Sequence, residues 1–308
     1  MLNLFIANTD NRWFDFLAAE PALMEVNFWW PGEMNFRAIQ PGELLVFRLK
    51  SPRNKIGGYG VFSSHSLLPI QMAWDTFGRA NGVSSFEALR SAIADYRGGE
   101  VGPNTNVGCT VLVEPVFFPP DRWIDLPESW SQSIQRGKLY SLENREGRHL
   151  WDQLQQPLLP TSVLARSGLL DRDEQARYGE PSLIKRRLGQ GAFRVAVTEA
   201  YGRQCAISDG KVLPALDAAH IKPFGEGGAH TESNGILLRK DIHCVFDAGY
   251  VTIGDKFRFE VSTKIKEIFN NGEEYLRLHG KSVRLPRNRE HWPNREFIEW
   301  HNNNRYVG

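Results

Sequence analysis

Two histidines and an asparagine stand close together in the stretch DAAHIKPFGEGGAHTESNGILLRKDIHCVFDAGY, which covers residues 217–250. Asn234 follows His220 by 14 residues, and His243 follows Asn234 by 9. An imidazole is near-neutral at cellular pH, so His220 can accept a proton from water, whereas His243 can bind a divalent metal ion. Phosphodiester hydrolysis needs such a base, a cation on the phosphate and stabilisation of the leaving 3′-oxygen. These residue types could serve such a reaction, but their spacing alone is a weak signal.

Three motifs around these residues carry a family resemblance: AAHIKP, SNGILL and RKDIHCVFDAGY. They resemble the HNH branch of the ββα-metal endonucleases, and the flanking LGQGAFRVAVTEAYGRQCAIS, LHGKSVRLP and WHNNNRY extend the resemblance over residues 183–305. The resemblance implies that His220 is the general base at the end of a hairpin strand and that His243 is the metal ligand on the facing helix. It implies that Asn234 braces the loop between the strands, which suits an amide because it can donate and accept at once.

The metal site departs from the family pattern at one position. Many relatives place an acid directly before the base histidine, where it binds metal, and here that position is Ala219. Asp217 lies two residues earlier on the strand, and Asp247 shares a helix face with His243. Either carboxylate could complete a one-metal site, and either could instead be structural. A mixed O/N ligand set next to a phosphate suits Mg²⁺ or Mn²⁺, or another transition metal.

Basic residues near these motifs are candidates for contacts with DNA phosphates. Arg194, Arg203, Arg239 and Lys240 flank the centre, although each on its own could equally belong to a solvated surface. From residue 181 onward there are 20 Lys and Arg against 15 Asp and Glu, which leaves the preceding residues net acidic. The excess of positive charge in the last part of the chain is consistent with a polyanionic partner.

Local patterns predict the elements that must position the centre. AFRVAVTEAYG predicts a helix that ends at Gly202, and CAIS, VLPALDAAHI and GYVTI predict strands. Residues 141–156 predict a helix, and the polar, Gly- and Pro-bounded stretch after it is typical of a linker. We therefore expect a nuclease domain at 182–308 and a helical linker at 141–181.

The first 140 residues predict a mixed, barrel-like domain. LNLFIAN, GELLVFRLK, GGYGVFSS and VGCTVLVEPVFF have strand character, whereas NRWFDFLAAE, MAWDTFGRAN and SSFEALRSAIADY have helical character. In the last of these, which begins with Ser, Phe86, Leu89, Ile93 and Tyr96 fall at helical spacing. The expected fold class is α+β, with a PUA-like β-barrel and helices first and a ββα-metal domain last.

Aromatic and basic residues in this first domain could bind a base taken out of a nucleic acid. Trp13, Trp30 and Trp74 are the chosen pocket residues, although tryptophans in a small barrel often belong to the core. A flipped base needs faces to stack on and cations for its flanking phosphates. Asp75, or Asp10 as an alternative, could accept a hydrogen bond from a cytosine amino group. The cations expected on the DNA backbone are Arg48, Lys50, Arg53, Lys55, Arg194 and Arg239.

The segments LFIANTDNRWFDFL, VNFWWPG, GELLVFRLKSP and GGYGVFS resemble the EVE domains of the PUA superfamily, small barrels that read modified bases. This resemblance covers residues 1–140. Together the two resemblances imply a modification-dependent restriction endonuclease whose partner is double-stranded DNA with 5-methyl- or 5-hydroxymethylcytosine. Cutting both strands with one HNH centre per chain calls for two centres, so a homodimer is expected.

Composition limits the other possibilities. An apolar content of 41% and a charged content of 24% are those of a globular protein rather than a disordered or membrane one. The three cysteines lie far apart, which argues against a disulfide framework and, with no secretion signal at the first residues, favours the cytoplasm. Two other functions stay open: a nuclease for modified RNA or damaged DNA, and a DNA-binding module that has lost catalysis.

Overall fold

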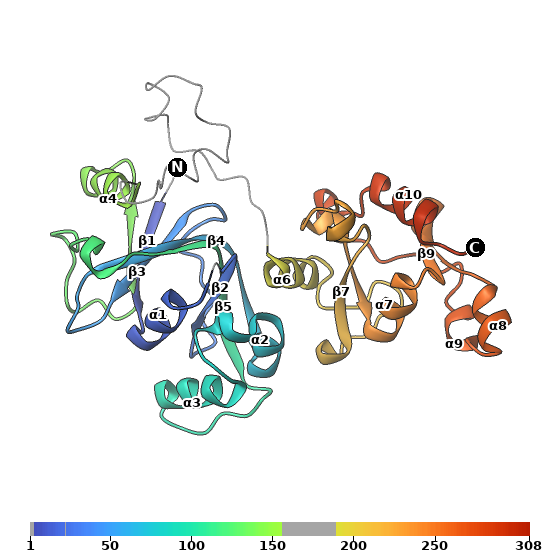
Figure 1. Cartoon of the computed structure of the whole chain (residues 1–308), viewed down its shortest axis with the longest axis horizontal. Helices are drawn as coiled ribbons and strands as arrows, with labels where there is room; N and C mark the ends of the chain where they lie inside the picture. The colour runs from blue at the N-terminus through green and yellow to red at the C-terminus, as the bar shows by residue number, and fades with distance from the viewer. Residues whose placement is uncertain (1–2, 22, 156–188) are drawn as a thin grey trace, which may run out of the picture. The chain divides into compact units, whose positions relative to one another are not determined.

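The computed structural model describes residues 3–21, 23–155 and 189–308, and these divide into two compact units, within residues 1–186 and 187–308 (Figure 1). Both units combine β-sheet with helices, so the predicted α+β class is confirmed. In the ranges that the structure describes, no helix has the length and apolar character needed to cross a membrane.

The first unit is built on one six-stranded sheet. Its strand order is β2-β5-β4-β3-β1-β6, with β1 parallel to β3 and the other neighbours antiparallel. The strands are β1 (Asn3–Thr9), β2 (Glu25–Trp30), β3 (Leu44–Leu49), β4 (Ile56–Pro69), β5 (Asn106–Phe117) and β6 (Gly137–Ser141). Two register shifts interrupt the β4–β5 ladder. Because bulges of this kind bend a strand and increase its twist, the long β4 can curve around the core.

The α-helices among the described residues of the first unit are α1 (Asn11–Ala18), α2 (Ile70–Phe77), α3 (Phe86–Arg97) and α4 (Arg145–Gln155). In Figure 1, α3 and α4 lie at opposite ends of the unit. The core between α1 and the sheet is aromatic, and Trp13 of α1 makes edge contacts with Phe28 and Phe47 at ring-centroid distances of 5.3 and 5.4 Å. The helix therefore anchors its indole in the same aromatic cluster that the strands build.

The helix α3 shows how far the apolar spacing predicts burial. Ser85 caps its start by accepting a hydrogen bond from the Ala88 N–H, and Leu89 and Ile93 are fully buried, as the spacing predicts. Tyr96 has the same helical spacing, but it is 43% exposed. It lies in the last turn of α3, and its hydroxyl meets Asp10 and Lys50, which follow β1 and β3.

The helical segment predicted at 141–156 contains α4. The remainder of the predicted linker, residues 156–181, lies outside the described residues. The borders of the predicted domains at 140 and 181 stay predictions.

The second unit contains a hairpin followed directly by a helix. The strands β7 (Leu216–His220) and β8 (Gly235–Arg239) pair antiparallel, and α7 (Lys240–Asp247) begins at the next residue. A second hairpin is formed by β9 (Val251–Gly254) and β10 (Arg258–Val261). The other helices are α6 (Gln190–Ala200), α8 (Lys264–Phe269), α9 (Glu273–Leu276) and α10 (Arg295–Asn304). The order strand, strand, helix is the ββα arrangement that the sequence predicts.

The helix α6 packs tightly on the start of β8. A Cβ at Gly235 would lie 2.3 Å from Val197 Cγ2, so only glycine allows this approach. Residues 205–208 form a turn rather than the predicted strand. Cys205 N donates to Gly210 O at 2.8 Å, and this hydrogen bond closes the turn. Ala206 N donates to Leu237 O of β8, but this single bond does not extend into a β-ladder.

Candidate active site and ligand pocket

His220 and His243 belong to one site in the second unit. His220 is the last residue of β7 and pairs with Gly235, and His243 lies on α7, which packs against the same hairpin. The two side chains are close enough that charge on His243 opposes charge on His220 and contributes to the lowered pKa of His220. The structure thus brings together the two histidines that the sequence singles out.

The imidazole of His220 is held in an aromatic and neutral environment. Its ring stacks on Phe193 of α6 at a centroid distance of 3.8 Å and an interplanar angle of 10°. Its Nε2 lies 2.9 Å from Nδ1 of His230. Burial is the largest cause that lowers the pKa of His220, to about 4, and the nearby His230 and His243 add to it. The ring is therefore uncharged at neutral pH and free to accept a proton.

His243 has the opposite environment, because a carboxylate lies at each ring nitrogen. Its Nδ1 is 3.1 Å from Oδ2 of Asp217, and its Nε2 is 3.2 Å from Oδ2 of Asp247. Burial alone lowers the pKa of His243, but the hydrogen bonds to Asp217 and Asp247 outweigh it and raise the pKa to about 9. Arg194 Nε lies 3.5 Å from the other oxygen of Asp217. This pair of carboxylates makes His243 a position that favours positive charge.

The donor set around His243 fits a divalent cation. One imidazole nitrogen and carboxylate oxygens are ligands that Mg²⁺, Mn²⁺ and related ions accept. The carboxylates lie at opposite nitrogens, and within the described residues no three His, Cys, Asp or Glu side chains converge as a metal cluster. An ion bound to one ring nitrogen of His243 would also bind the carboxylate on that side. The other carboxylate would accept a hydrogen bond from the N–H at the second ring nitrogen, as is common for histidine ligands. Ala219, at the position where relatives carry an acid, is fully buried.

Asn234 ties together the loop between β7 and β8. Its side chain is fully buried, its Oδ1 accepts from Lys222 N at 2.9 Å, and its Nδ2 donates to Lys222 O and Ala229 O, both at 2.9 Å. All three contacts are to backbone, so the amide sets the conformation of the chain on both sides of the loop. Lys222 is two residues after His220, so the brace acts next to that histidine.

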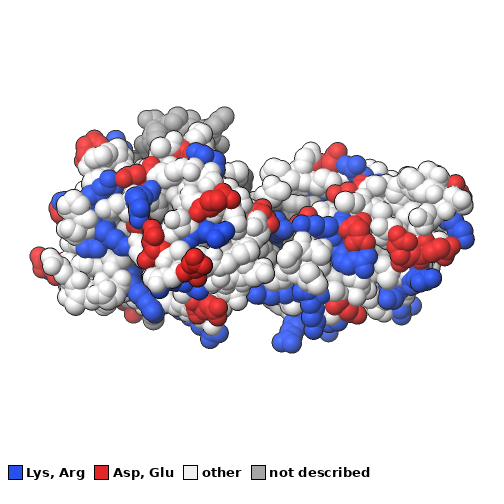
Figure 2. Space-filling model, turned by 90° about the horizontal axis from the view of Figure 1, so that it is seen from below, with Lys and Arg blue, Asp and Glu red and all other residues white. Residues whose placement is uncertain are grey.

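Several basic residues predicted to hold phosphates are paired with acids instead. In the second unit Arg194 lies near Asp217, and the guanidinium of Arg239 binds Asp241. In the first unit the same holds for Arg53 with Asp15 and Lys55 with Asp125, while Arg48 donates to Asn8 and Asn54. On the face drawn in Figure 2, Lys and Arg side chains mix with acidic ones over the first unit and gather along one edge of the second.

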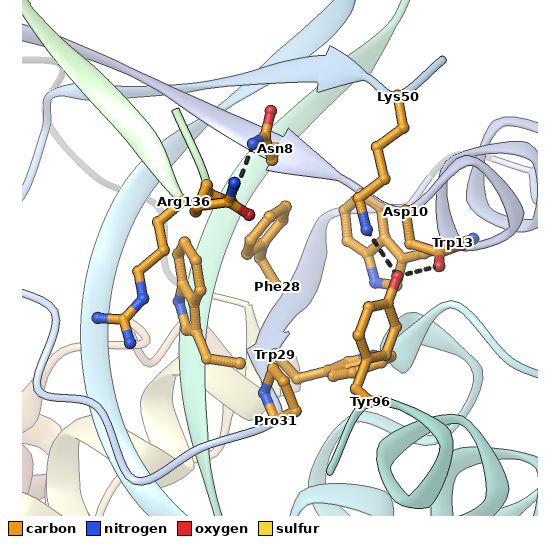
Figure 3. Close-up of a pocket in the computed structure, with 11 residues that line it drawn as sticks. Asn8, Asp10, Trp13, Phe28, Trp29, Pro31, Lys50, Tyr96 and Arg136 are labelled. Carbon is orange, nitrogen blue, oxygen red and sulfur yellow. Dashed lines mark hydrogen bonds between the residues drawn. The ribbon is translucent and has the colours of Figure 1, made fainter. Parts of the chain in front are cut away.

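The first unit has a cavity of about 200 Å³ between β1, β2, the end of β3 and α3 (Figure 3). Drug-sized ligands need roughly 300 Å³ or more, so this space suits a single flat group. The residues that line it are Asn8, Asp10, Trp13, Phe28, Trp29, Trp30, Pro31, Lys50, Tyr96, Gln135 and Arg136. Its walls therefore combine aromatic faces with two cationic side chains.

The tryptophans of this pocket have their N–H groups occupied by the protein. Trp13 Nε1 donates to Asn27 O at 3.2 Å, Trp29 Nε1 to Asn81 O at 3.0 Å and Trp30 Nε1 to Thr110 Oγ1 at 2.9 Å. Trp13 and Trp30 are also almost completely buried, at 5% and 8% exposure. They offer a ligand their ring surfaces and no polar atom.

A chain of three polar residues forms one wall of the pocket. Asp10 accepts from Arg12 N and Trp13 N, which caps α1, and its other oxygen accepts from the Tyr96 hydroxyl. Lys50 Nζ in turn donates to the Tyr96 oxygen at 2.7 Å (Figure 3). An ammonium has three N–H donors, so Lys50 keeps donors for a ligand, whereas the two oxygens of Asp10 are already engaged. The wall is a donor surface.

Trp74 and Asp75, which the sequence analysis places in the base pocket, do not line this cavity. Both lie on α2, which follows β4, and neither is among the residues that line the cavity. Asp75 is exposed and accepts a hydrogen bond from Gln71 Nε2 at 2.9 Å, one turn earlier on its own helix. The cause is the register of α2, whose Ile70, Ala73 and Phe77 face the core.

Sequence reasoning did not select several residues that the structure places in these sites. His230 was overlooked, although it is a third histidine inside the motif stretch. In the pocket, Asn8, Tyr96 and Arg136 come from three segments far apart in the sequence. No local sequence pattern indicates that these three segments meet. The one available signal for Tyr96 is its polar hydroxyl at the end of a predicted amphipathic helix.

Comparison with known proteins finds a family match within the second unit. Residues 205–254 match the family model of HNH endonucleases. This range includes β7, β8 and α7 and therefore the site of His220, Asn234 and His243. No curated protein matches the chain.

Solved structures resemble the chain more distantly. A single-residue variant of the ASCH protein of Zymomonas mobilis shares 11% identity, covering 49% of this chain and 95% of its own, with a TM-score of 0.35. The ASCH protein without that change shares 13%, covering 48% and 94%, with a TM-score of 0.33. The modification-dependent TagI restriction endonuclease shares 14%, covering 86% of this chain and 62% of its own, with a TM-score of 0.27.

Proposed function

We propose that this chain is a cytoplasmic, metal-dependent DNA endonuclease directed by a modified cytosine. The observation that carries the proposal is the pairing of a neutral His220 with a His243 held between two carboxylates, inside residues that match the HNH endonuclease model. A neutral base beside a position that favours a cation is the arrangement that phosphodiester hydrolysis requires.

The residues of the site have distinct roles in the proposed reaction. His220 takes the proton of the attacking water. Asn234 holds the loop that follows His220. His243, with Asp217 or Asp247, would hold a Mg²⁺ or Mn²⁺ ion, which supplies positive charge to the phosphate and to the leaving oxygen. Arg194, once Asp217 turns to an ion, can donate to a phosphate oxygen.

The pocket of the first unit is the proposed reader. Its aromatic faces suit a flipped base, and the donors of Lys50 suit the ring carbonyl and ring nitrogen acceptors of a cytosine. Burying an added methyl group contributes roughly 0.8 kcal/mol, so easier flipping or coupling to cleavage must add to the preference for 5-methyl- or 5-hydroxymethylcytosine. Arg48, Arg53, Lys55 and Arg239 are proposed backbone contacts that exchange their present partners for phosphates.

A cleavage panel tests this function. Matched duplexes with cytosine, 5-methylcytosine or 5-hydroxymethylcytosine, and an RNA of the same sequence, are incubated with the protein and Mg²⁺ or Mn²⁺. We expect cutting of modified DNA that is lost in His220→Ala. Equal cutting of all DNA duplexes would refute the reader, preferential cutting of RNA would favour an RNA substrate, and binding without cutting under every metal would indicate a non-catalytic module.

A further inference from the structure

We propose that His230 is a positioning residue that fixes the tautomer of His220 and so makes it competent as a base. The proposal rests on the proposed nuclease function and assigns to a third histidine a part in the same site. His230 lies in the loop between β7 and β8, four residues before Asn234. Its Nδ1 is 2.9 Å from Nε2 of His220.

The two imidazoles are held between two phenylalanines. Phe193 stacks on His220 with a centroid distance of 3.8 Å, and Phe224 stacks on His230 with a centroid distance of 4.4 Å and an interplanar angle of 15°. Each imidazole is stacked against one phenylalanine ring, and this stacking limits how far the imidazole can turn while the hydrogen bond between the two histidines is kept. Phe224 is itself 61% exposed, so the stacked pair of Phe224 and His230 lies near the surface of the unit.

The protonation of the pair determines what His220 can do. Burial lowers the pKa of both rings, so both are neutral and a single proton lies between the two nitrogens. If His230 donates that proton, Nδ1 of His220 carries the other hydrogen and cannot act as a base. If His220 donates from Nε2, its Nδ1 is an open acceptor. Among the described residues no hydrogen bond to that Nδ1 is formed, so it remains available to water.

The hydrogen bond also supports the charged form of His220 that proton abstraction produces. Once Nδ1 has taken a proton, the Nε2–H of His220 donates to Nδ1 of His230 as a charge-assisted bond, which is about twice as strong as a neutral one. His230 therefore acts on His220 as an orienting acceptor acts on a catalytic histidine in general.

The loop is built to bring His230 to this position. Asn234 Nδ2 donates to Ala229 O, the residue before His230, and to Lys222 O, two residues after His220. A Cβ at Gly228 would lie 1.9 Å from Lys222 O, so the two sides of the loop touch there. The brace thus controls the spacing between both histidines.

The test compares His230→Ala and His230→Asn in the full chain with Mg²⁺ or Mn²⁺. The Oδ1 of asparagine can accept where Nδ1 does. We expect His230→Ala to lower kcat about 10- to 100-fold with KM unchanged, the size typical of lost partners that orient a functional histidine. We expect His230→Asn to recover most of that loss. His291→Ala, which changes a histidine of a different segment, should have wild-type kcat.

Selective ¹⁵N labelling of histidine gives a readout that does not need activity. In the wild type the His220 signals should report the Nε2–H tautomer, and in His230→Ala they should shift towards a mixture of tautomers. Unchanged kcat in His230→Ala, no recovery in His230→Asn, or unchanged His220 signals would each overturn the proposal. If the wild type cuts no nucleic acid, the proposed function fails, while the ¹⁵N signals still test the tautomer.

Discussion

His220 and His243 are the same residue type in one site, yet their surroundings move their pKa values in opposite directions. Phe193 and burial keep His220 uncharged, and the carboxylates of Asp217 and Asp247 favour a proton or another cation on His243. Groups whose surroundings separate their pKa values in this way take different roles in a reaction. The proposed division into base and metal ligand therefore rests on the neighbours of the two rings and not on the imidazoles themselves.

Metal binding at His243 should release a proton. The raised pKa, about 9, means that the ring is protonated at pH 7, and a metal ligand must be neutral. Affinity should therefore rise about tenfold for each pH unit up to about 9. Calorimetric titration of Mn²⁺ at pH 7 in buffers of different ionisation enthalpy should give about one proton released per ion. His243→Ala should abolish the release, and an unchanged release in that variant would place the ion elsewhere.

If the pocket reads a modified base as proposed, Lys50 should determine its affinity for that base. Its ammonium carries the unused donors of the pocket wall, and a hydrogen bond from a charged donor contributes roughly 1.5–3 kcal/mol. Lys50→Met should weaken binding of a 5-methylcytosine duplex on the order of 10- to 100-fold in a fluorescence anisotropy titration. Lys55→Met, whose lysine pairs with Asp125 away from the pocket lining, is the matched control. If both changes weakened binding equally, Lys50 would act only through its charge near the DNA phosphates and not through a hydrogen bond to the base.

At the scale of elements, the loop between β7 and β8 depends on a close approach at Gly228. The added Cβ of Gly228→Ala would overlap Lys222 O, whereas a Cβ at Gly225 of the same loop meets nothing within 4 Å. Gly228→Ala should therefore destabilise the second unit by roughly 1–3 kcal/mol, the usual cost of overpacking. Hydrogen exchange of residues 221–234 should accelerate in Gly228→Ala and stay unchanged in Gly225→Ala. Similar exchange in both variants would contradict the close packing.

The elements also explain why one site could be predicted from sequence and the other only in part. His220, Asn234 and His243 lie within one hairpin and the helix after it, so the sequence motifs that surround them are also close in space. The pocket joins β1, β2, β3, α3 and the segment before β6, and long-range pairing decides which side chains meet. Trp13 and Trp30 line this pocket, whereas Trp74 lies on α2 outside its lining, and the role of each in base binding stays a prediction.

At the scale of the whole molecule, the described residues contain one site of the HNH type, and the proposed cutting of both strands of a duplex calls for two. A second copy of the chain is the simplest source, which the sequence analysis expects as a homodimer. The charge of the chain does not oppose this association, because its formal net value is only +1.

Linearisation of a plasmid with one modified site should therefore depend more steeply on enzyme concentration than nicking does. Inactive His220→Ala protein, added in excess, should convert linear product into nicked product, because mixed pairs cut one strand. Gel quantification of the two products measures both effects. Linearisation in strict proportion to enzyme, unaffected by the inactive variant, would show that one chain cuts both strands.

The hydrogen bonds from the indole N–H groups of Trp13, Trp29 and Trp30 to the protein frame have a consequence for selectivity. Walls that are already fixed lose little conformational entropy when a ligand enters, so the pocket is preorganised. A preorganised slot cannot widen cheaply for a larger group, and it gains nothing from a smaller one that leaves a gap. The affinity of the pocket for a base should then depend on the shape and volume of the substituent that the base carries.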